Sequence, residues 1–371
     1  MNVPKIRYDN FTKEWEKVKL SSQASFLQGL TYTPNDVSND GTIVLRSSNI
    51  QNSMVDYNDI VRVNIIIPEK LKIKENDILM CVRNGSKSLV GKTAWLSKNE
   101  EKCTWGAFMN IIRPKERNKF VYYYLNSKYF YNHVWKDLGT ATVNQITKQT
   151  LESCYLNIPS IEEQEKISNT LSLLDQKIKL QSKKIEDLKL FKLSKYSSVF
   201  SKSNNKIKLS DICIIEKGKQ INSDLLIEKG NYYMLNGGIL PSGYLNEYNT
   251  NENTITISEG GNSCGYVNFN KTKFWCGGHC YKIISSSVNS SYLYHLLKHN
   301  EKIIMDLRVG SGLPNIQKKD LEALKLSIHK NDEQLKIGIL FDTFDKKINL
   351  ETNKLNKFKE LKKALMQVMF V

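Results

Sequence analysis

The sequence predicts an α+β protein in which two mixed α/β domains are separated and joined by two long helices that pair with each other. Three observations predict this fold. Residues 151–200 recur at 321–370, where 16 of the 50 aligned positions are identical. Both copies carry apolar residues at the spacing of a coiled-coil seam. The stretch before each copy mixes strand-like and helix-like segments, so the chain reads as a domain and a helix, repeated once.

The first predicted domain covers residues 1–150. Its segments TIVLRSSNI, DILMCV and FMNIIRP are rich in apolar and β-branched residues, so we expect strands there. The segment KFVYYYLNSKYFYNHVW begins at Lys119 and is expected to be a helix. Its many tyrosines are more typical of packing against a core than of stacking on nucleic-acid bases.

The first helical spacer covers residues 151–205. We expect its helix to run from Glu162 to Phe200, with acidic residues in the first turn that suit a helix N-terminus. The apolar positions are spaced by 4, 3, 4, 7 and 3 residues. These positions form the predicted seam, which consists of Ile167, Leu171, Leu174, Ile178, Ile185 and Leu188.

The second predicted domain covers residues 206–320 and follows the polar linker SKSNNK, which begins at Ser201. It opens with IKLSDIC, much as the first domain opens with VKLSSQA. The segments TITISE and YKIIS are expected to be strands, and SSYLYHLLKHNEKIIMDL, from Ser290, is expected to be the second tyrosine-bearing helix.

The second helical spacer covers residues 321–371. Its seam has the spacing of the first and consists of Ile337, Phe341, Phe344, Ile348, Leu355 and Phe358. Both seams carry a polar residue in the seven-residue gap, Gln181 and Glu351. A narrow apolar stripe must be buried against another surface, and the simplest partner for each helix is the other copy. The alternative is that two unrelated amphipathic helices lie on their own domains.

Length and charge favour a multidomain protein that binds a polyanion. The 371 residues suggest two or three domains. The formal net charge is +16 and the isoelectric point is about 9.3. Residues 1–150 hold 22 basic and 14 acidic residues, a net charge of +8. A surplus of this size points to nucleic acid as a partner, although a basic protein with no such partner is the competing interpretation.

The composition also favours a cytoplasmic protein. No apolar run approaches the roughly 20 residues of a membrane-spanning helix, and the polar N-terminal stretch lacks the apolar centre of a signal peptide. The seven cysteines are scattered and odd in number, which fits reduced thiols better than a disulfide framework.

Motifs that carry chemistry are incomplete or absent in the sequence. The segment LVGKT ends like a phosphate-binding loop, but Ser86 stands where that loop requires its first glycine. The sequence contains neither HExxH nor GxSxG, no dinucleotide-binding glycine loop after a strand, and no Asn/Asp-Pro-Pro-aromatic methyltransferase motif. We therefore expect the chain to have no catalytic residues and to carry no cofactor.

One group of residues has side chains of the types that bind zinc: Cys264, Cys276, His279 and Cys280. However, the adjacent residues His279 and Cys280 would point to opposite sides of a strand. The first domain has no equivalent group, only Cys103 in KCTWGAFMN. We favour a structural role for these cysteines over a zinc site or a reactive nucleophile, and we predict no metal.

The repeated segments resemble the specificity subunit of type I restriction–modification enzymes. The resemblance rests on LESCYLNIPSIEEQEKISNTLSLLDQKI and LEALKLSIHKNDEQLKIGILFDTFDKKI, with support from the loops GTATVNQITKQTL and GSGLPNIQKKDL and from NDILMCVRNGSKSLVGKTAW. The second copy departs from the pattern before its helix, where His329, Lys330 and Asn331 replace Pro159, Ser160 and Ile161.

The resemblance implies a division of labour. Each mixed domain would be a target recognition domain that reads one half of a split, gapped site in double-stranded DNA. The two helices would pair as an antiparallel coiled coil about a pseudo-two-fold axis and set the gap at about one helical turn, ~34 Å. They would also dock two methyltransferase (modification) subunits. S-adenosylmethionine, ATP and Mg²⁺ would belong to those subunits and to the restriction/translocase subunits.

Direct readout needs polar or basic side chains on loops that a scaffold holds in place. In the first domain the candidate DNA-contacting residues are Arg46, Ser47, Ser48, Asn49, Arg83, Asn84, Ser86, Lys87, Thr140, Thr142, Asn144 and Gln145. In the second domain they are Asn236, Gly237, Gly238, Asn262, Ser263, Arg308, Ser311 and Asn315. For each of these residues the alternative is an ordinary solvated loop residue.

Two other functions stay open at this point. The chain could be a nuclease or methyltransferase that uses the repeat as a scaffold, which the incomplete motifs argue against. It could also be an adaptor whose coiled coil joins proteins without DNA, which the charge of the first domain argues against.

Overall fold

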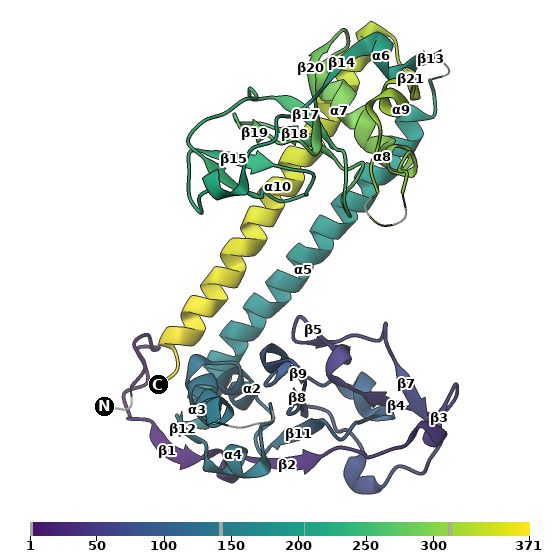
Figure 1. Cartoon of the computed structure of the whole chain (residues 1–371). Coiled ribbons are helices and arrows are strands. Elements are labelled where there is room, and N and C mark those ends of the chain that lie inside the picture. Colours follow the sequence, from purple (N-terminus) through teal and green to yellow (C-terminus); the bar gives the residue numbers. More distant parts are fainter. Residues whose placement is uncertain (1–2, 141–143, 204, 311, 313) are drawn as a thin grey trace. The chain divides into compact units, whose positions relative to one another are not determined.

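Each mixed domain is built on a four-stranded antiparallel sheet, and the two sheets have the same order of strands (Figure 1). The structure is a computed structural model that describes residues 3–140, 144–203, 205–310, 312 and 314–371. The chain folds as two units. Residues 1–180 and 354–371 form unit 1, and residues 181–353 form unit 2. The two long helices, α5 (Ile161–Phe200) and α10 (Asn331–Val368), each contribute to both units.

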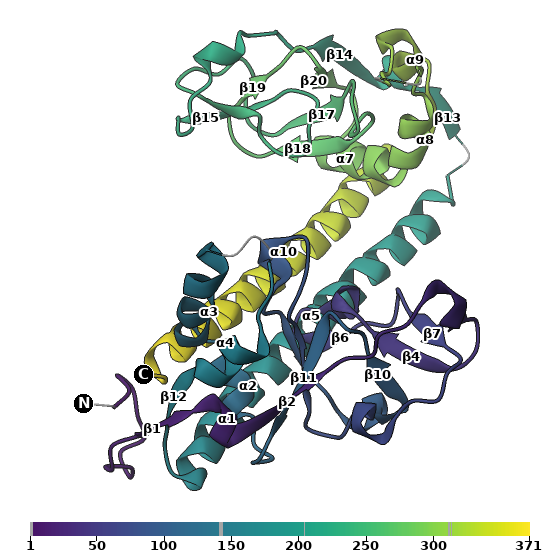
Figure 2. The same ribbon diagram turned by 60° about the horizontal axis from the view of Figure 1, so that its bottom comes forward.

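Unit 1 contains the first mixed domain. Its strands are β1 (Glu16–Lys19), β2 (Ala24–Gln28), β3 (Val37–Ser38), β4 (Thr42–Leu45), β5 (Ile50–Gln51), β6 (Met54–Val55), β7 (Val61–Val63), β8 (Ile78–Cys81), β9 (Thr93–Trp95), β10 (Cys103–Trp105), β11 (Met109–Pro114) and β12 (Tyr155–Ile158). Its short helices are α1 (Leu20–Gln23), α2 (Phe120–Leu125), α3 (Lys128–Thr140) and α4 (Lys148–Ser153). The central sheet has the order β2-β11-β8-β9, and a second sheet has the order β10-β4-β7-β3. Figure 2 labels β2 and β11 of the central sheet and β10, β4 and β7 of the second sheet.

Unit 2 contains the second mixed domain. Its strands are β13 (Asn205–Lys208), β14 (Cys213–Lys217), β15 (Tyr232–Leu235), β16 (Gly243–Leu245), β17 (Thr254–Ser258), β18 (Val267–Asn270), β19 (Trp275–Cys276), β20 (Cys280–Ser286) and β21 (Lys325–Ile328). Its short helices are α6 (Leu209–Ile212), α7 (Ser290–His299), α8 (Glu301–Asp306) and α9 (Lys318–Glu322). The central sheet is β14-β20-β17-β18, and the smaller one is β16-β15-β19.

The registers show which positions of the two domains correspond. In unit 1, Cys81 of β8 pairs with Met109 of β11. In unit 2, Ser258 of β17 pairs with Cys280 of β20. Each domain also pairs a first strand with the strand before its long helix, β1 with β12 and β13 with β21, and contains one parallel pair, β10 with β4 and β19 with β15. The two mixed domains are therefore built on one topology, although the sequence identity between them is low.

The tyrosine-bearing helices differ from the prediction in one respect. Each is broken into two helices, α2 and α3 at Asn126–Ser127, and α7 and α8 at Asn300. Asn126 turns its amide back to the carbonyl of Tyr122 at 2.8 Å, and Asn300 does the same to Leu296 at 2.8 Å. Such local side-chain bonds compete with the helical backbone pattern and end the helix. The tyrosines of α2 are buried, as predicted.

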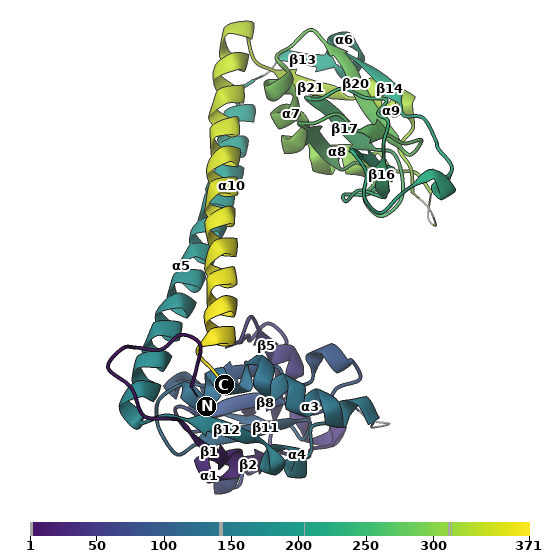
Figure 3. The ribbon, with the colours of Figure 1, turned by 90° about the vertical axis from the view of Figure 1, so that its left-hand side faces the viewer.

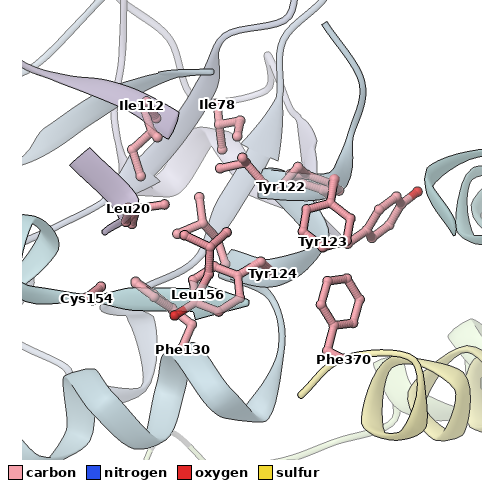
Figure 4. Packing of buried hydrophobic residues seen from close by; sticks show 14 of the residues in the cluster. Leu20, Ile78, Ile112, Tyr122, Tyr123, Tyr124, Phe130, Cys154, Leu156 and Phe370 are labelled. Carbon is pink, nitrogen blue, oxygen red and sulfur yellow. The ribbon is translucent and has the colours of Figure 1, made fainter. Parts of the chain in front are cut away.

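Each core is completed by the far end of the long helix that begins in the other unit. In unit 1, Met366, Met369 and Phe370 join the cluster that contains α2, and the rings of Phe120 and Phe370 lie 5.2 Å apart (Figure 4). In unit 2, Phe200 has the corresponding place in the cluster that contains α7. Phe200 and Phe370 are equivalent in the repeat, so both cores are closed in the same way.

All twelve predicted seam residues are buried or half-buried. Ile167, Leu171, Leu174, Ile185, Ile337 and Phe341 are buried, and Ile178, Leu188, Phe344, Ile348, Leu355 and Phe358 are half-buried. The first part of each seam packs into the core of its own domain, since Ile167 and Leu171 belong to the cluster of unit 1 and Ile337 and Phe341 to that of unit 2. Each seam therefore packs first against its own domain and then against the other helix, so both interpretations of the sequence apply to part of it.

The helices α5 and α10 pair antiparallel, as Figure 3 also shows. In unit 1, Lys362 Nζ lies 2.6 Å from Asp175 Oδ1. In unit 2, Lys192 Nζ lies 2.5 Å from Asp345 Oδ1. These two ion pairs are the same pair in repeat numbering, because Asp175 corresponds to Asp345 and Lys192 to Lys362. A repeated contact of this kind is what a pseudo-two-fold relation between two copies produces.

The polar gap in the seam is filled by residues that correspond to each other. Gln181 Nε2 donates to Glu351 Oε2 at 2.6 Å, and Lys184 Nζ lies 2.9 Å from Glu351 Oε1. Gln181 and Glu351 are equivalent positions of the repeat, so the repeat relation maps this contact onto itself. A polar pair in an apolar seam fixes the register of the two helices.

The segment before β1 contacts both long helices within unit 1. Arg7 Nε donates to Glu163 Oε1 at 2.7 Å, and the indole of Trp15 donates to the same oxygen at 3.3 Å. The amide of Ile6 donates to the carbonyl of Val368 at 3.2 Å. The N-terminal segment therefore contacts both long helices within unit 1.

Within the described residues, no helix is long and apolar enough to span a membrane.

Candidate nucleic-acid interface

Three loops of the first domain meet at one edge, and Asn84 joins them. This residue follows β8. Its amide nitrogen donates to Ser47 Oγ, after β4, at 3.0 Å. Its backbone N–H donates to the carbonyl of Asn144, before α4, at 3.3 Å, and its Oδ1 accepts from the N–H of Ser86 at 2.9 Å. The sequence-predicted groups around 46–49, 83–87 and 144–145 therefore lie together.

Further contacts hold the same loops. The amide of Asn144 donates to the carbonyl of Gly85 at 3.1 Å, and Arg83 forms an isolated antiparallel bridge with Gln145. Arg83, Ser86 and Gln145 are exposed, whereas Ser47, Ser48, Asn84, Lys87 and Asn144 are half-buried. The backbone is fixed while several donors and acceptors remain exposed, which suits a surface that reads a ligand.

The two basic residues of this edge stand over aromatic rings. The guanidinium carbon of Arg83 lies 5.1 Å from the centre of the Phe108 ring, and Lys87 Nζ lies 4.8 Å from the centre of the Trp135 ring. Contacts of this kind restrict long side chains without neutralising them. Both cations therefore remain available to a polyanion.

Asn49 does not belong to the exposed set, which corrects the prediction. It is fully buried, and its Oδ1 accepts from the N–H of Arg46 at 2.8 Å. Its amide nitrogen donates to the carbonyls of Asp56 and Asp59 at 2.9 and 2.8 Å. Asn49 shapes the loop after β4, because its side chain satisfies three backbone groups that a turn would leave unpaired. Arg46 is partly committed too, with Nη2 2.8 Å from Asp59 Oδ1.

A cavity of about 860 Å³ opens beside these loops. Its lining is mostly apolar and consists of Leu30, Thr31, Tyr32, Thr33, Pro34, Val37, Arg46, Ser47, Ser48, Asp59, Val61, Gly106, Ala107, Phe108 and Met109. Among the described residues, no acceptor lies within hydrogen-bond distance of the buried Arg46 Nε. The cavity thus joins apolar surface to the predicted polar residues 46–48.

The second domain brings the corresponding loops together. Asn315 forms bridges with both Gly260 and Val309, and its N–H donates to the carbonyl of Val309 at 3.0 Å. The N–H of Gly261 donates to the carbonyl of Pro314 at 3.0 Å. The bridge between Gly260 and Asn315 repeats the bridge of the first domain. The loop after β17 and the loop before α9 therefore meet as their counterparts do.

The predicted residues of this domain differ in accessibility. Gly238, Asn262, Arg308 and Asn315 are exposed, and Asn236 and Ser263 are half-buried. Gly237 is buried, has a φ of +83°, and accepts a hydrogen bond from Ser258 Oγ at 2.5 Å. The prediction of Gly237 as a DNA contact is therefore corrected, because this glycine serves the turn, where a side chain would be strained.

Three predicted residues are not placed by the structure. Thr142 and Ser311 lie outside the described residues, and so does the side chain of Thr140, at the end of α3. Their assignment to the interface stays a prediction.

The second edge carries a buried carboxylate that the first edge lacks. Glu259 Oε1 lies 2.5 Å from Lys217 Nζ and accepts from the hydroxyl of Tyr281 at 3.2 Å. Burial and the nearby Glu259 together raise the pKa of Tyr281 to about 12, so its hydroxyl stays protonated. His279 Nδ1 lies 3.7 Å from Glu259 Oε2. The equivalent position in the first domain is the apolar Val82.

A family model described as the type I restriction modification DNA specificity domain matches the chain twice, at residues 12–190 and 202–360. The chain belongs to this family. The two matches each cover one mixed domain and most of the long helix that follows it, and they confirm the resemblance of the repeated segments.

Individual specificity subunits are similar to the chain over different lengths. The type I specificity subunit S.MpnORF638P of Mycoplasma pneumoniae is 34% identical over 144 residues, which is 38% of each chain. The chain therefore spans well under half the length of this relative. The MjaX specificity subunit of Methanocaldococcus jannaschii is 24% identical over 414 residues, 99% of this chain and 95% of that one. The crystal structure of the S subunit of M. genitalium has the same fold, with a TM-score of 0.68 at 19% identity over 100% and 99% of the two chains.

Two exposed residues beside these loops are not among the candidates that the sequence offers. Phe108 and His279 occupy equivalent positions, because each directly precedes the residue of β11 or β20 that pairs with β8 or β17. The sequence pattern places Phe108 in a strand and presents His279 only as a metal-ligand type. The parallel between TWGAFMNII and WCGGHCYKI was the signal that could have found them.

The three cysteines considered as zinc ligands lie in the interior of the second mixed domain. Cys264, Cys276 and Cys280 are all buried, and Cys276 Sγ lies 3.6 Å from the carbonyl of Cys280. Burial raises the pKa of Cys264, which disfavours its thiolate. Among the described residues, no three His, Cys, Asp or Glu side chains form a group that could hold a metal ion.

Proposed function

We propose that the chain is a sequence-specific DNA-binding subunit that recognises a bipartite, gapped site in double-stranded DNA, with one half read by each mixed domain. One observation carries this proposal. In both domains, which share one topology, the loop after the central strand pairs with the loop before the last short helix. The residues exposed on these loops differ, as Arg83 and its counterpart Gly260 do. Two equal scaffolds with different edges suit two half-sites of different sequence.

The charge supports duplex DNA as the ligand. The chain has a net charge of +16, and exposed Arg83 and Arg308 stand at the loop edges of the two domains. Cations on the interface release counterions from DNA, so affinity should fall steeply as salt is raised. An adaptor that joins proteins without DNA would show no such dependence on DNA and salt.

The paired helices support a second part of the proposal, the recruitment of partner subunits. Exposed apolar side chains on α5 include Leu173, Leu180, Leu190, Phe191 and Leu193, and those on α10 include Leu335, Ile339, Leu340, Leu350 and Leu361. Leu180 corresponds to Leu350 in the repeat, and Phe191 to Leu361. Exposed apolar positions that recur in both copies suit two copies of one partner, which we propose to be methyltransferase subunits.

The chain itself would carry out no chemistry in this proposal. S-adenosylmethionine, ATP and Mg²⁺ would bind to the methyltransferase subunits and to the restriction/translocase subunits, and the complex would act on DNA in the cytoplasm. The role of the chain is to position these subunits, so the paired helices would set the number of unread base pairs between the half-sites.

The decisive experiment is genome-wide mapping of adenine methylation in source cells with and without this gene. We expect one split motif, two short words around a fixed unread gap, to lose methylation when the gene is deleted and to regain it when the gene is restored. Unchanged methylation, in cells that express the partner methyltransferase, would contradict the proposal and favour the adaptor.

A further inference from the structure

The connection between the parallel-paired strand and the central sheet has the same form in both domains. In unit 1 it runs from β10 to β11 through residues 106–108, and in unit 2 it runs from β19 to β20 through residues 277–279. The carbonyl of Phe108 accepts from the N–H groups of Val82 and Arg83 at 3.0 and 3.2 Å. The carbonyl of His279 accepts from the N–H of Glu259 at 3.0 Å. Both backbones are thus anchored to the loop that follows the central strand.

The side chains on these anchored backbones are exposed. Phe108 is 57% exposed, and the side chain of His279 is 64% exposed. A large ring that is held at its backbone but left open to solvent has no role in the core, and a lone exposed ring is common on protein surfaces. Here the two rings also stand at equivalent places, each beside the loops already assigned to DNA.

The surroundings of Phe108 are apolar. Its ring lines the cavity of about 860 Å³, together with Tyr32, Val61 and Met109. One group that DNA offers to such a surface in the major groove is the 5-methyl group of thymine, and phenylalanine is a known partner for it. The guanidinium carbon of Arg83 lies 5.1 Å from the centre of this ring, so a cation stands beside the apolar surface.

The surroundings of His279 are polar. Its N–H donates to Asn236 Oδ1 at 3.0 Å, which ties it to the loop after β15. Gly237 lies so near that an added Cβ would come within 3.0 Å of the carbonyl oxygen of His279. Nδ1 of the exposed ring lies 3.7 Å from Glu259 Oε2, too far for a hydrogen bond, so the neutral ring can carry its proton on Nε2. An imidazole N–H in this place can donate to the acceptors of a purine edge.

We propose that Phe108 and His279 are specificity-determining residues that contact bases at equivalent places of the two half-sites. Phe108 contacts the methyl group of a thymine in the first half-site, and His279 donates a hydrogen bond to N7 of a purine in the second. This inference rests on the proposed function, because it presumes that the two domains read DNA.

The test removes single groups from the DNA instead of from the protein. The full chain, assembled with its methyltransferase subunits, is titrated with duplexes that carry the methylated motif of the source cells. In one series each thymine of the first half-site is replaced by deoxyuridine, which lacks only the methyl group. In a second series each purine of the second half-site is replaced by its 7-deaza analogue, which lacks only the N7 acceptor.

We expect one deoxyuridine position to weaken binding by the wild type about fourfold, the value of one buried methyl group. The variant Phe108→Ala should bind the thymine and deoxyuridine duplexes equally. One 7-deaza position should weaken binding by the wild type about fivefold or more, and His279→Ala should not distinguish that pair of duplexes. A residue that acts only by holding Arg83 would lower affinity for thymine and deoxyuridine duplexes alike.

Each variant also serves as a control, because its response to changes in the half-site of the other domain should stay unchanged. Phe108→Ala should keep the full response to 7-deaza purines in the second half-site, and His279→Ala should keep the response to deoxyuridine in the first. If the chain binds the split motif but neither variant changes any single-group response, this inference is wrong and the proposed function stands. If the assembled chain binds no split motif, the proposed function itself fails.

Discussion

The two mixed domains share a scaffold and differ at three equivalent positions of the loop edge. Arg83 corresponds to Gly260, Val82 to the buried Glu259, and Phe108 to His279. The strand order, the parallel pair and the closing phenylalanine are the same in both. The difference teaches that the backbone contacts of the loops do not depend on the residues at their edge. If these loops read DNA as proposed, residues at their edge can change without loss of the backbone contacts that hold them.

The comparison extends to the core behind the edges. Tyr123 of α2 and His295 of α7 each contact a carboxylate of a long helix within their own unit. The hydroxyl of Tyr123 donates to Asp175 Oδ2 at 2.8 Å, whereas His295 Nε2 lies 3.1 Å from Asp342 Oδ1. Burial raises the pKa of Tyr123 and lowers the pKa of His295. The contact in unit 1 is thus made by a group that stays neutral, and the contact in unit 2 by a group that titrates.

The largest expected effects come from the two closing phenylalanines. Phe370→Ala should destabilise unit 1, and Phe200→Ala should destabilise unit 2, each by about 3–5 kcal/mol, because each leaves a cavity in a buried cluster. Hydrogen exchange read by mass spectrometry reports on the two units separately. If Phe200→Ala increased exchange in unit 1 as strongly as in unit 2, the division into two separately closed cores would be wrong.

The next effect concerns the edge of the first domain. Arg83→Ala should weaken binding of the first half-site by about 1–3 kcal/mol if the guanidinium contacts a base. Duplexes in which one half-site at a time is scrambled assign the loss to one domain. Lys70→Ala is the charge-matched control, since Lys70 is exposed and outside the three loops. An equal loss in both variants would show that only the overall charge matters.

A smaller effect tests the equivalence of the two ion pairs. Asp175→Asn and Asp345→Asn should each lower the free energy of unfolding of its own unit by about 0.2–1 kcal/mol, since both pairs are partly exposed. Asparagine keeps an oxygen that can accept from Tyr123. Chemical denaturation of the two variants beside the wild type measures both losses. A loss in one variant alone would break the symmetry inferred from the repeat.

The smallest effect is a pH dependence that should be confined to unit 2. The lowered pKa of His295 means that the unfolded chain binds the proton more readily, so His295 contributes its stability fully above pH 6.5 and loses it as the pH falls below that value. His299, whose pKa burial also lowers, acts in the same direction. The titratable groups that face His295 include Asp342, Asp345, Tyr196, Tyr294 and Lys192.

The measurement compares hydrogen exchange of α7 at pH 7.5 and 5.5. The wild type should exchange faster at the lower pH, after correction for the intrinsic rate, and His295→Gln should reduce that difference. The segment of α2 around Tyr123 is the internal control and should show no such change. A change of the same size in α2 would locate the pH dependence elsewhere.

The regular parts of the molecule were predictable because they follow periodic signals. The spacing of the seam placed α5 and α10 to within a residue or two, and the 170-residue repeat gave the equivalence of Gln181 and Glu351. The loops around 46–49, 83–87 and 144–145 are also predicted from sequence, and the structure brings them together. They follow strands of two different sheets, β4 and β8, or precede α4, so the order of the elements alone does not predict that they meet.

The remaining features depend on contacts that one sequence does not reveal. Asn49 has the polarity of a base-reading residue, yet neighbouring backbone groups use all of its hydrogen-bonding capacity. Gly237 is a backbone requirement, which composition alone cannot distinguish from a close approach to DNA. The sequence pattern places Phe108 in a strand because it is the first residue of the largely apolar run FMNIIRP. Only the register of β8 with β11 showed that it stands just outside.

The way α10 closes unit 1 has a consequence for protein synthesis. The core around α2 is assembled from the first half of the chain, but Met366, Met369 and Phe370 are the last of its buried members to be translated. Unit 2, by contrast, has all of its buried members by residue 341. All buried members of the second core are therefore translated before the last three of the first, so the two cores become complete in the reverse of the order in which their domains begin.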